Sequence, residues 1–542
     1  MSYRVLVTDS LAEEGLELLR SAGDIELVVA TKLDFDGLRA ALREADGIVI
    51  RSGTRLTAEV LADQPRLKVI ARAGVGIDNV DVPAATRQGI VVMNTPGGNT
   101  VSTAEHTMAL LLALSRNVAP ACASLKAGKW DRGKYTGNQL GDKTLGIVGL
   151  GRVGLAVAKR ALAFDMKVVG FDPFLSADRA LEHGVESIPR LDLLWDKCDF
   201  ITLHTPMSEE TRHLVNKQAF DKMKPGVRLI NCARGGLIDE AALLEALDSG
   251  KVAGAAIDVF EPEPPPTDHP LVKHPKVLVT PHLGASTEEA QVSVAVEAAR
   301  LVIDFLESGR VRFAVNMPAL DRAELEDIRL YLDLARRLGM LHAQMNRGVI
   351  KSARIRFRGE VAAKNTKMIT SAFAAGWLES ALEGQVNLVN ADILAKERGI
   401  TIAAETATDP ADFGTLIQTE VVTDRKTYEA SGTLFGKQFV RLVKLGPYHL
   451  DAYLDGVLLV FTHHDVPGLI GFLGTTMGRH GVNIAQMNVG REHPGGEAIG
   501  VVNLDSIPSD EALDEVRRHK DILSLSLIKL PKAGAVPPWL GG

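Results

Sequence analysis

The sequence predicts an α/β fold with two doubly wound, Rossmann-like lobes, followed by an α+β domain and a small ferredoxin-like βαββαβ domain. Three observations lead to this prediction. Through residues 1–318, short apolar runs alternate with helical patterns, as in βαβ units built around parallel sheets. A G-x-G-x-x-G turn follows one of these runs. Residues 455–530 show the order strand, helix, strand, strand, helix, strand, which is the ferredoxin-like arrangement.

Length and composition limit the number of domains and the kinds of partner that the chain can have. The chain has 542 residues, which corresponds to three or four domains at about 100–200 residues each. A hydrophobic content of 46% is ample for packed cores. The net charge of −7 gives no reason to expect nucleic acid or an anionic membrane as a partner. No apolar run approaches the ~18 residues of a membrane span.

The chain contains three cysteines, Cys122, Cys198 and Cys232. They are too few and too widely spaced for a disulfide framework or a zinc cluster, so we expect reduced thiols and no metal site. The N-terminal run Arg4–Thr8 is typical of a strand and lacks a signal-peptide pattern. These features predict a cytoplasmic protein.

The first lobe is predicted over residues 1–100 and 287–318. Its strands are expected at Arg4–Thr8, Glu26–Val29, Gly47–Ile50, Val69–Ala71 and Val91–Asn94, with helices at Glu13–Ala22 and Phe35–Glu44. A long helical pattern, Thr287–Ser308, would return the chain to this lobe, and Val311–Pro318 resembles a short strand and linker. The lobe is therefore discontinuous, with the second lobe, residues 101–286, inserted.

The second lobe is expected to begin with a strongly apolar hinge helix at Thr103–Arg116. Residues 126–137 would follow as a basic loop containing Trp130. Either Trp130 anchors this loop on its own lobe, or the loop reaches the active site of a neighbouring subunit, and the residues leave both interpretations open.

The glycine-rich turn carries the strongest local signal. Gly149 permits a sharp turn, Gly151 lets backbone approach a pyrophosphate, and Gly154 permits close helix–strand packing. The helix that starts there directs free N–H groups and a positive dipole end at phosphates. Asp172 ends the next strand about 20 residues later, where a carboxylate would hold the ribose 2′-hydroxyl. Dinucleotide binding is favoured over a plain βα turn because strand, helix and acid are all in place.

The predicted strands of the second lobe end near Asp172, Thr205, Asn231, Asp258 and Thr280. Three further candidate side chains, Arg234, Glu263 and His282, follow the last three of these ends. His282 can take a hydroxyl proton as hydride leaves, because histidine titrates near neutral pH. Glu263 could fix its tautomer and stabilise the imidazolium. Arg234 could hold a substrate carboxylate bidentately. The alternatives are that His282 is only a turn residue, that Glu263 is a solvated acid in a loop, and that Arg234 is a charge at the start of a helix.

The four motifs occur in a fixed order: the glycine fingerprint, Asn231-Cys232-Ala233-Arg234-Gly235, Asp258-Val259-Phe260 with Glu263-Pro264, and Thr280-Pro281-His282. In this order they resemble the D-isomer-specific 2-hydroxyacid dehydrogenase family. The resemblance implies NAD as cofactor and Arg234, Glu263 and His282 as the catalytic trio. It also implies cofactor contacts at Gly149, Gly151, Arg152, Val153, Gly154, Asp172, Thr205, Cys232, Ala233, Asp258, Gly284 and Ala285. The implied substrate positions are Arg51, Ser52, Gly74 and Asn99, with Trp130 from the basic loop.

The resemblance continues beyond these lobes. Residues 319–454, which include Val386-Asn387-Leu388-Val389-Asn390-Ala391, resemble the intervening domain of long members of the family. Their pattern predicts a helix at Ala323–Met345, a strand at Lys351–Phe357, two helical runs, and strands at Thr415–Val422 and Gly432–Leu442.

Residues 455–530 resemble an ACT regulatory domain. Strands are expected at Val457–Thr462, Ile484–Arg491, Glu497–Leu504 and Ile522–Leu530, with helices at Leu469–Arg479 and Asp510–Lys520 and a loose tail at Ala533–Gly542. By resemblance, His463, Asp465 and Asn483 match positions that contact an L-serine effector. The alternative is that Asp465 caps the helix and the domain only dimerises. The resemblance implies a homo-oligomer, with dimers through the nucleotide lobes and tetramers through the regulatory domains.

The implied reaction is NAD-dependent oxidation of 3-phospho-D-glycerate to 3-phosphohydroxypyruvate, the first step of L-serine biosynthesis. One position departs from the pattern: some relatives carry a second arginine two residues after Arg51, where this chain has Gly53. The phosphate would then depend on other cations, such as Lys126, Lys129, Arg132 or Lys134 of a neighbouring subunit. The alternatives are an enzyme for glyoxylate, hydroxypyruvate or D-lactate, disfavoured by the regulatory tail, and a non-enzymatic NAD-sensing co-regulator, disfavoured by the retained trio.

Overall fold

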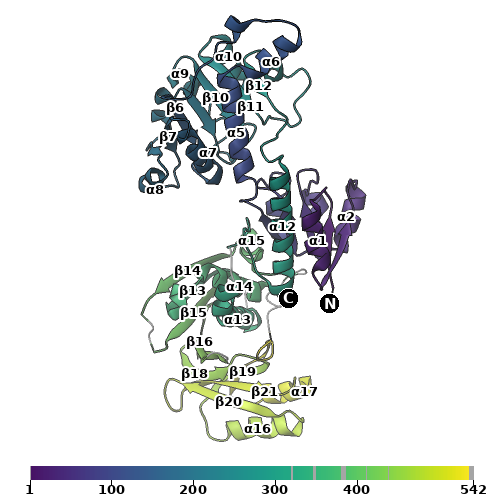
Figure 1. The fold of residues 1–542 in the computed structure, drawn as a ribbon. Helices are drawn as coiled ribbons and strands as arrows, with labels where there is room; N and C mark the ends of the chain where they lie inside the picture. The colour runs from purple at the N-terminus through teal and green to yellow at the C-terminus, as the bar shows by residue number, and fades with distance from the viewer. Residues whose placement is uncertain are drawn as a thin grey trace.

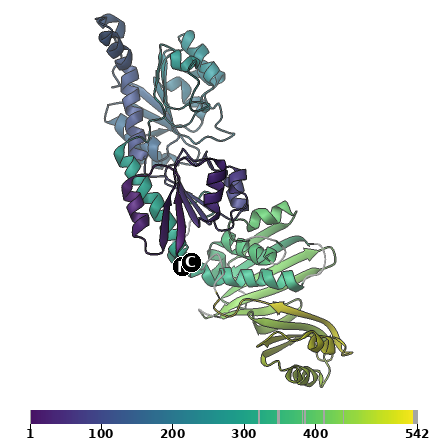
Figure 2. The same ribbon diagram turned by 90° about the vertical axis from the view of Figure 1, so that its right-hand side faces the viewer.

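The computed structural model describes residues 2–318, 322–345, 350–379, 382, 386–409, 412–436 and 439–535. The chain forms four sheets that follow one another along an elongated molecule (Figures 1 and 2). The second sheet lies at the top of Figure 1, the first in the middle, and the third and fourth below. This is the mixed α/β architecture that the sequence predicts.

The first sheet is parallel, with the strand order β2-β1-β3-β4-β5. Its strands are β1 Tyr3–Val7, β2 Ile25–Val29, β3 Gly47–Ile50, β4 Val69–Arg72 and β5 Val91–Asn94, all within one residue of the prediction. Buried apolar residues cover both faces, which explains the nearly continuous apolar runs.

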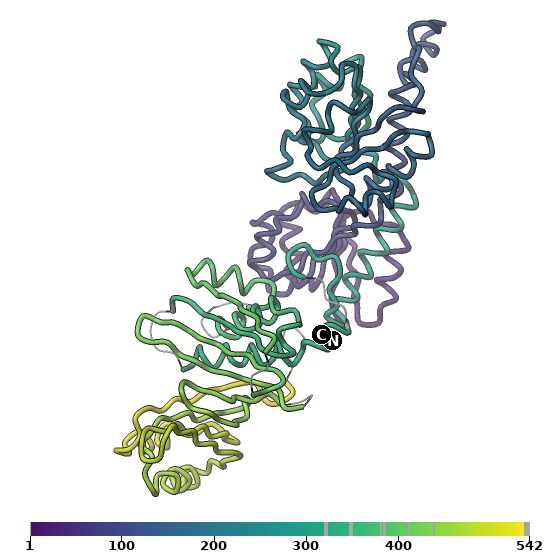
Figure 3. The backbone as a smooth tube through the Cα atoms, turned by 90° about the vertical axis from the view of Figure 1, so that its left-hand side faces the viewer, coloured from purple at the N-terminus to yellow at the C-terminus, as the bar shows by residue number. Residues whose placement is uncertain are grey.

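Two groups of helices cover this sheet. One face carries α2 (Phe35–Arg43), α3 (Ala58–Leu61) and α4 (Val82–Arg87), and the other carries α1 (Glu13–Ser21) and α12 (Glu288–Ser308). The long helix α12 thus returns from the second lobe to pack on α1, and Figure 3 shows its teal segment beside the purple start of the chain. Val311–Pro318 forms no strand in the structure. Ala314 makes an isolated bridge to Met93 instead.

The second sheet has the order β12-β11-β10-β9-β6-β7-β8, and every pairing in it is parallel. Its strands are β6 Thr144–Val148, β7 Lys167–Phe171, β8 Glu186–Ser187, β9 Phe200–Leu203, β10 Val227–Asn231, β11 Val252–Ile257 and β12 Val277–Val279. Its helices include α7 Arg152–Leu162, α8 Ala177–Glu182, α9 Lys217–Lys222, α10 Glu240–Asp248 and α11 Pro270–Lys273. The order reverses between β6 and β9, the position where doubly wound sheets bind ligands.

The hinge region differs from the expectation. The apolar helix α5 spans Thr100–Ser115, so it starts earlier than predicted, and a further helix, α6 (Val118–Lys126), precedes the basic loop. Lys126 therefore belongs to a helix, and Arg132–Tyr135 form a single 3-10 turn. None of the residues of α6 is buried in this chain, so its helical character left no core-facing pattern to detect.

The third sheet has the order β14-β13-β15-β16-β17-β18. Its elements are α13 Arg322–Met345, β13 Ile350–Gly359, α14 Thr366–Leu378, α15 Ala391–Glu397, β14 Thr401–Ala407, β15 Thr415–Thr423, β16 Thr427–Phe435, β17 Phe439–Leu445 and β18 Tyr448–Tyr453. The predicted single strand Gly432–Leu442 is wrong: it spans parts of two antiparallel strands, β16 and β17, whose alternating patterns run together. The edge strands β14 and β18 were not predicted.

The fourth sheet has the order β20-β21-β19-β22, which confirms the ferredoxin-like arrangement. Its elements are β19 Val457–His464, α16 Leu469–Arg479, β20 Ile484–Arg491, β21 Glu497–Leu504, α17 Asp510–Arg517 and β22 Ile522–Lys529. Most of the expected tail Ala533–Gly542 lies outside the described residues.

Specific polar contacts join neighbouring domains. The fully buried Arg337 pairs with Asp333 at 2.9 Å and donates to the carbonyl oxygens of Leu454 and Pro531, so it ties the third domain to the fourth. The Asn387 amide donates to Gly89 O at 2.9 Å, which ties the third domain to the first lobe. Among the described helices, no single one is both long and apolar enough to cross a membrane, although the bent pair α5 and α6 passes that test jointly.

Candidate active site

The turn after β6 has the geometry of a phosphate cradle. Gly149 has a φ of 94°, and a Cβ there would lie 2.6 Å from the carbonyl oxygen of His204. A Cβ on Gly154 would collide with the Gly149 carbonyl, whereas Gly151 faces open space. Helix α7 starts directly afterwards with Arg152 and Val153 and has no side-chain cap, so its first N–H groups are available. The turn therefore fits a dinucleotide pyrophosphate.

The predicted ribose acid lies beside this turn. The Asp172 carboxylate follows β7, and its Oδ2 accepts the Leu150 N–H at 2.8 Å while Oδ1 accepts the Phe174 N–H at 2.8 Å. Thr205 follows β9, and its hydroxyl is buried without a partner in the described part of the chain. An unpartnered buried hydroxyl is costly unless a ligand satisfies it, so Thr205 also fits a bound cofactor.

Cofactor preference gives a direct test of Asp172. An acid at this point accepts ribose hydroxyls and repels a 2′-phosphate, so NAD is expected to be used in strong preference to NADP. Asp172→Ala should narrow that preference, measured as the ratio of the two kcat/KM values, with Asp178→Ala on the nearby α8 as a control. Equal use of both cofactors by the unaltered enzyme would contradict this placement.

A buried carboxylate organises the turn that carries His282. Asp258 is fully buried, and it accepts the Thr280 hydroxyl at 2.6 Å, the Leu283 N–H at 2.8 Å and the Gly284 N–H at 3.0 Å. Burial alone would raise the pKa of Asp258, but hydrogen bonds from His106, Thr280 and the Leu283 N–H hold it below its usual value. Asp258 is therefore ionised at neutral pH and clamps residues 280–284.

His106, Cys232 and Asp258 lie within 4.8 Å of one another beneath this turn. Burial raises the pKa of Cys232 to about 12, so its thiol is neutral. The oxygens of Asp258 already accept several hydrogen bonds. This arrangement suits a structural network and a cofactor contact better than metal ligation.

The predicted acid–base pair is in direct contact. His282 Nδ1 lies 2.7 Å from Glu263 Oε2, and Glu263 Oε1 accepts the Phe260 N–H at 3.0 Å. His282 has a φ of 54°, an uncommon backbone conformation held by a bond from its N–H to Asp258 O at 2.9 Å. Although burial alone would raise the pKa of Glu263, the hydrogen bonds from His282 and Phe260 and the charge of Arg234 lower it. Glu263 is thus ionised at neutral pH.

Arg234 extends from the second lobe to the first. Its Nε donates to Asp78 Oδ2 at 3.1 Å, and its Nη1 donates to Ala233 O at 2.7 Å. The guanidinium lies so close to Gly76 that any side chain at position 76 would collide with it. Arg234 therefore lies between the lobes, where it can hold an anion in the cleft.

The predicted substrate positions follow β3, β4 and β5 of the first sheet. Arg51 Nη1 donates to Ser10 O at 3.0 Å, and the Asn79 amide holds the carbonyl oxygens of Arg51 and Thr54 at 2.6 Å each. Ser52 is exposed. Gly74 has a φ of 153°, and Asn99 precedes α5 with its Oδ1 buried and unpartnered in the described part of the chain. All of these residues lie at the carboxyl edge of the sheet.

Arg72, the last residue of β4, was not predicted as a site residue. Its Nε is buried without a partner in the described part of the chain, and its guanidinium lies against Gly74. Burial, followed by the charges of Arg234 and Arg51, lowers its pKa to about 10, so it stays charged at neutral pH. An arginine at the carboxyl end of a central parallel strand was the available signal. Arg72 is thus close enough to Arg51 and Arg234 for the three guanidinium charges to form one cationic group.

Trp130 is 76% exposed, which leaves its ring little contact with its own lobe. The interpretation of Trp130 as a local anchor therefore finds no support in this chain. The four cations around it, Lys126, Lys129, Arg132 and Lys134, are exposed as well.

Of the predicted effector residues, His463 and Asp465 lie at one end of the fourth sheet, whereas Asn483 lies at the opposite end of the sheet in the same chain. Asp465 Oδ2 accepts from Arg491 at 3.0 Å and from the Gly495 N–H at 3.1 Å, and these bonds hold the pKa of Asp465 below its usual value. The Asn483 amide donates to Asp505 at 2.6 Å. His463 is buried, with Nε2 unpartnered in the described part of the chain. Helix α16 has Gly468 as N-cap and no side-chain cap, so the alternative role of Asp465 as its cap is wrong.

The fold and these contacts define an NAD-dependent oxidoreductase with a histidine–carboxylate pair in an interlobe cleft. The family model "D-isomer specific 2-hydroxyacid dehydrogenase, NAD binding domain" matches residues 108–284. "D-3-phosphoglycerate dehydrogenase intervening domain" matches residues 327–446, and "ACT domain" matches residues 457–521.

Curated relatives extend over the whole chain. D-3-phosphoglycerate dehydrogenase of Bacillus subtilis is 42% identical over 98% of this chain and 100% of its own length. The enzyme of that name from Methanocaldococcus jannaschii is 41% identical over 97% of this chain and 100% of its own. The chain belongs to the D-3-phosphoglycerate dehydrogenase family, and its cofactor is NAD.

Solved structures match the two N-terminal lobes. The TT0316 protein of Thermus thermophilus has a TM-score of 0.53 and 39% identity, covering 58% of this chain and 99% of that one. A glyoxylate reductase of Paecilomyes thermophila has a TM-score of 0.54 and 30% identity, covering 58% of this chain and 98% of that one.

Proposed function

We propose that the chain oxidises 3-phospho-D-glycerate to 3-phosphohydroxypyruvate, the entry step of L-serine biosynthesis. The observation that carries this proposal is the group of three guanidiniums, Arg51, Arg72 and Arg234, whose charges act on one another beside the His282–Glu263 pair. Three neighbouring cations suit a substrate with both a carboxylate and a phosphate. The full-length relatives carry the same reaction in their names, whereas the glyoxylate reductase covers only 58% of this chain.

The proposed roles follow from the geometry. Arg234 orients the C1 carboxylate and the C2 oxygen between the lobes. Because Nδ1 of His282 is bonded to Glu263, Nε2 is the atom that takes the C2 hydroxyl proton. Glu263 stabilises the imidazolium that forms. When NAD is bound, its nicotinamide ring accepts the hydride.

Arg72 also offers a replacement for the second arginine that some relatives have at the position of Gly53. Its guanidinium is close enough to Arg51 for the two charges to interact, so the chain supplies a second cation for the phosphate without an arginine at position 53. Movement of the lobes about α5 and α12 would exclude water from the interlobe cleft.

The deciding experiment measures NADH formation from 3-phospho-D-glycerate, D-glycerate and D-lactate. We expect kcat/KM for the phosphorylated acid to exceed the other two by about 10²-fold or more, since each lost charged contact costs about 1.5–3 kcal/mol. Comparable turnover of D-lactate would overturn the substrate assignment while leaving the dehydrogenase class intact.

We propose a homodimer through the nucleotide lobes and a tetramer through the regulatory domains. Helix α6 buries no residue in this chain, and Val118, Leu125 and Trp130 are 53%, 56% and 76% exposed, which is typical of an apolar surface that a second copy covers.

Mixed subunits test whether Trp130 serves the neighbouring site. A His282→Ala chain mixed with a Trp130→Ala chain should regain activity, toward about a quarter of the wild-type sites for random dimers. Size measurement by light scattering checks that mixed dimers form. Activity that never exceeds the two parents, with mixed dimers present, would contradict a shared site.

We propose that L-serine binds between paired ACT domains and lowers activity, which requires a difference in affinity between two states of the enzyme. Asp465 and Asn483 would hold its amino and carboxylate groups. Calorimetry should show binding that Asn483→Ala weakens by about tenfold, as expected for one hydrogen bond to a charged group. D-Serine is the matched control ligand. Neither heat nor inhibition at millimolar L-serine would leave the domain a structural one.

We also propose a cytoplasmic location. Cys122, Cys198 and Cys232 are free thiols, as expected in a reducing compartment.

A further inference from the structure

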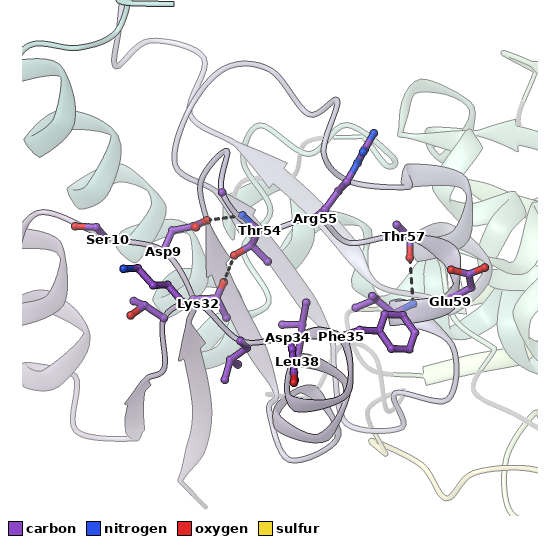
Figure 4. A pocket seen from close by; sticks show the side chains of 15 residues that line it. Asp9, Ser10, Lys32, Asp34, Phe35, Leu38, Thr54, Arg55, Thr57 and Glu59 are labelled. Atoms are coloured by element: carbon purple, nitrogen blue, oxygen red, sulfur yellow. Dashed lines mark hydrogen bonds between the residues drawn. The ribbon is translucent and has the colours of Figure 1, made fainter. Parts of the chain in front are cut away.

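A second pocket opens at the carboxyl edge of the first sheet, outside the cleft described above. It is lined by residues that follow β1, β2 and β3 and by the first turns of α2 and α3 (Figure 4). Its volume is about 610 Å³. Pockets for metabolites and cofactors typically measure about 300–1,000 Å³, so a ligand of nucleotide size would fit here.

The pocket lies at the topological switch point of its sheet. After β1 the chain passes to α1 on one face, and after β3 it passes to α3 on the other face, so the strand order reverses between β1 and β3. Doubly wound sheets bind ligands in the crevice at this point, as the second sheet does between β6 and β9. The proposed reaction uses the crevice of the second sheet and the residues that follow β3, β4 and β5 in the first. It leaves the part of the first crevice that faces β1, β2 and α2 unexplained.

Internal hydrogen bonds hold the walls of this pocket in place. Asp9 Oδ2 accepts the Thr54 N–H at 3.2 Å, and the Thr54 hydroxyl donates to Thr8 at 2.8 Å (Figure 4). Asp34 and Thr57 cap the first turns of α2 and α3. The pocket is therefore preformed, which reduces the entropy cost of binding.

Other lining groups remain available to a ligand. Lys32 and Arg55 make no hydrogen bond or ion pair with any residue that the structure describes, and both line the pocket. The Phe35 ring is 48% exposed, next to the buried side chains of Leu38 and Val60. The carboxylates of Asp9, Asp34 and Glu59 also line the pocket, and that of Asp34 already caps α2.

We propose that this pocket binds a nucleoside monophosphate. The ammonium group of Lys32, which is unpaired within the described part of the chain, suits the phosphate. The carboxylates of Asp9 and Glu59 suit ribose hydroxyls, as an acid does in dinucleotide folds. The exposed Phe35 ring offers a stacking surface for a base. A simple anion would use only the ammonium group and a purely apolar ligand only the ring, whereas a nucleotide uses all three.

Binding there is linked to the catalytic cleft. Gly53 and Thr54 line the pocket and directly follow Arg51 and Ser52, and Asp9 also accepts the backbone N–H of Arg51. A nucleotide that shifts this loop would change substrate affinity, and by linkage the substrate would change nucleotide affinity.

The test is calorimetry on the full-length enzyme saturated with NADH, with uridine monophosphate as the probe. NADH fills the dinucleotide site, and a pyrimidine avoids competition for an adenosine subsite. We expect one site per chain. Uridine and inorganic phosphate should each bind at least about tenfold more weakly than the nucleotide, since each retains only part of the contacts.

Two variants and a matched control locate the site. Lys32→Asn, which suits the left-handed backbone at that position (φ 59°), and Phe35→Ser should each weaken binding by about tenfold. Arg43→Asn, at the exposed far end of α2, should leave binding unchanged. No heat at millimolar nucleotide, or an affinity in both pocket variants equal to that of the unaltered enzyme, would overturn the proposal. Equal binding of inorganic phosphate would overturn it in favour of a simple anion site. The readout is heat, so failure of the proposed reaction would not affect it.

Discussion

Replacing His282 by alanine is expected to lower kcat by roughly 10²–10⁴-fold, the usual contribution of general acid–base catalysis. The structure gives the reason: His282 Nδ1 is 2.7 Å from an ionised Glu263, so Nε2 remains as the proton acceptor. The NAD dissociation constant should change little, because the glycine-rich turn and Asp172 lie on other loops. Steady-state kinetics and fluorescence titration with NADH provide the two measurements.

Two further variants sharpen this experiment. Glu263→Gln should also lower kcat strongly, because the imidazole remains while the carboxylate that fixes its tautomer and stabilises the imidazolium is lost. His183→Ala, at the exposed end of α8, serves as the matched control and should retain full activity. Near-normal turnover in His282→Ala would remove His282 from the mechanism.

Substitution of Arg234 should have the second-largest effect, a loss of kcat/KM of roughly 10²-fold for Arg234→Lys. A lysine keeps the charge but cannot bridge a carboxylate bidentately, and two charged hydrogen bonds are worth about 3 kcal/mol or more. The expected loss is greatest in KM for the organic acid, with KM for NAD little changed. Arg190→Lys, on the exposed surface of the same lobe, is the control.

A second set of measurements distinguishes the role of Arg72 from that of Arg234. If Arg72 holds the phosphate, Arg72→Lys should raise KM for 3-phospho-D-glycerate more than KM for D-glycerate, whereas Arg234→Lys should affect both acids alike. Unchanged kinetics in Arg234→Lys would show that another group holds the C1 carboxylate.

Much of the fold could be predicted from local patterns. The strands β3 and β5, the helix α16 and the strands β20 and β21 begin and end at the predicted residues. These segments pack one face or both faces on a core, so burial imposes a regular spacing of apolar side chains that is visible in the sequence. Where burial was absent, as in α6, or where two strands run on without a clear break, as in β16 and β17, the pattern misled.

The candidate site also has some features that the sequence predicts and others that only the tertiary structure shows. Sequence alone determined the residue types and their order: the glycine-rich turn, Asp172, Arg234, Glu263 and His282. These positions depend on short-range requirements, such as a turn that only glycine permits or an acid at a strand end. Tertiary structure alone decided that Asp258 clamps the His282 turn, that Arg72 joins Arg51 and Arg234, and that a pocket opens between β1 and β3. The physical reason is that charge interaction and cavity shape depend on distances between segments far apart in the chain, which no local spacing encodes.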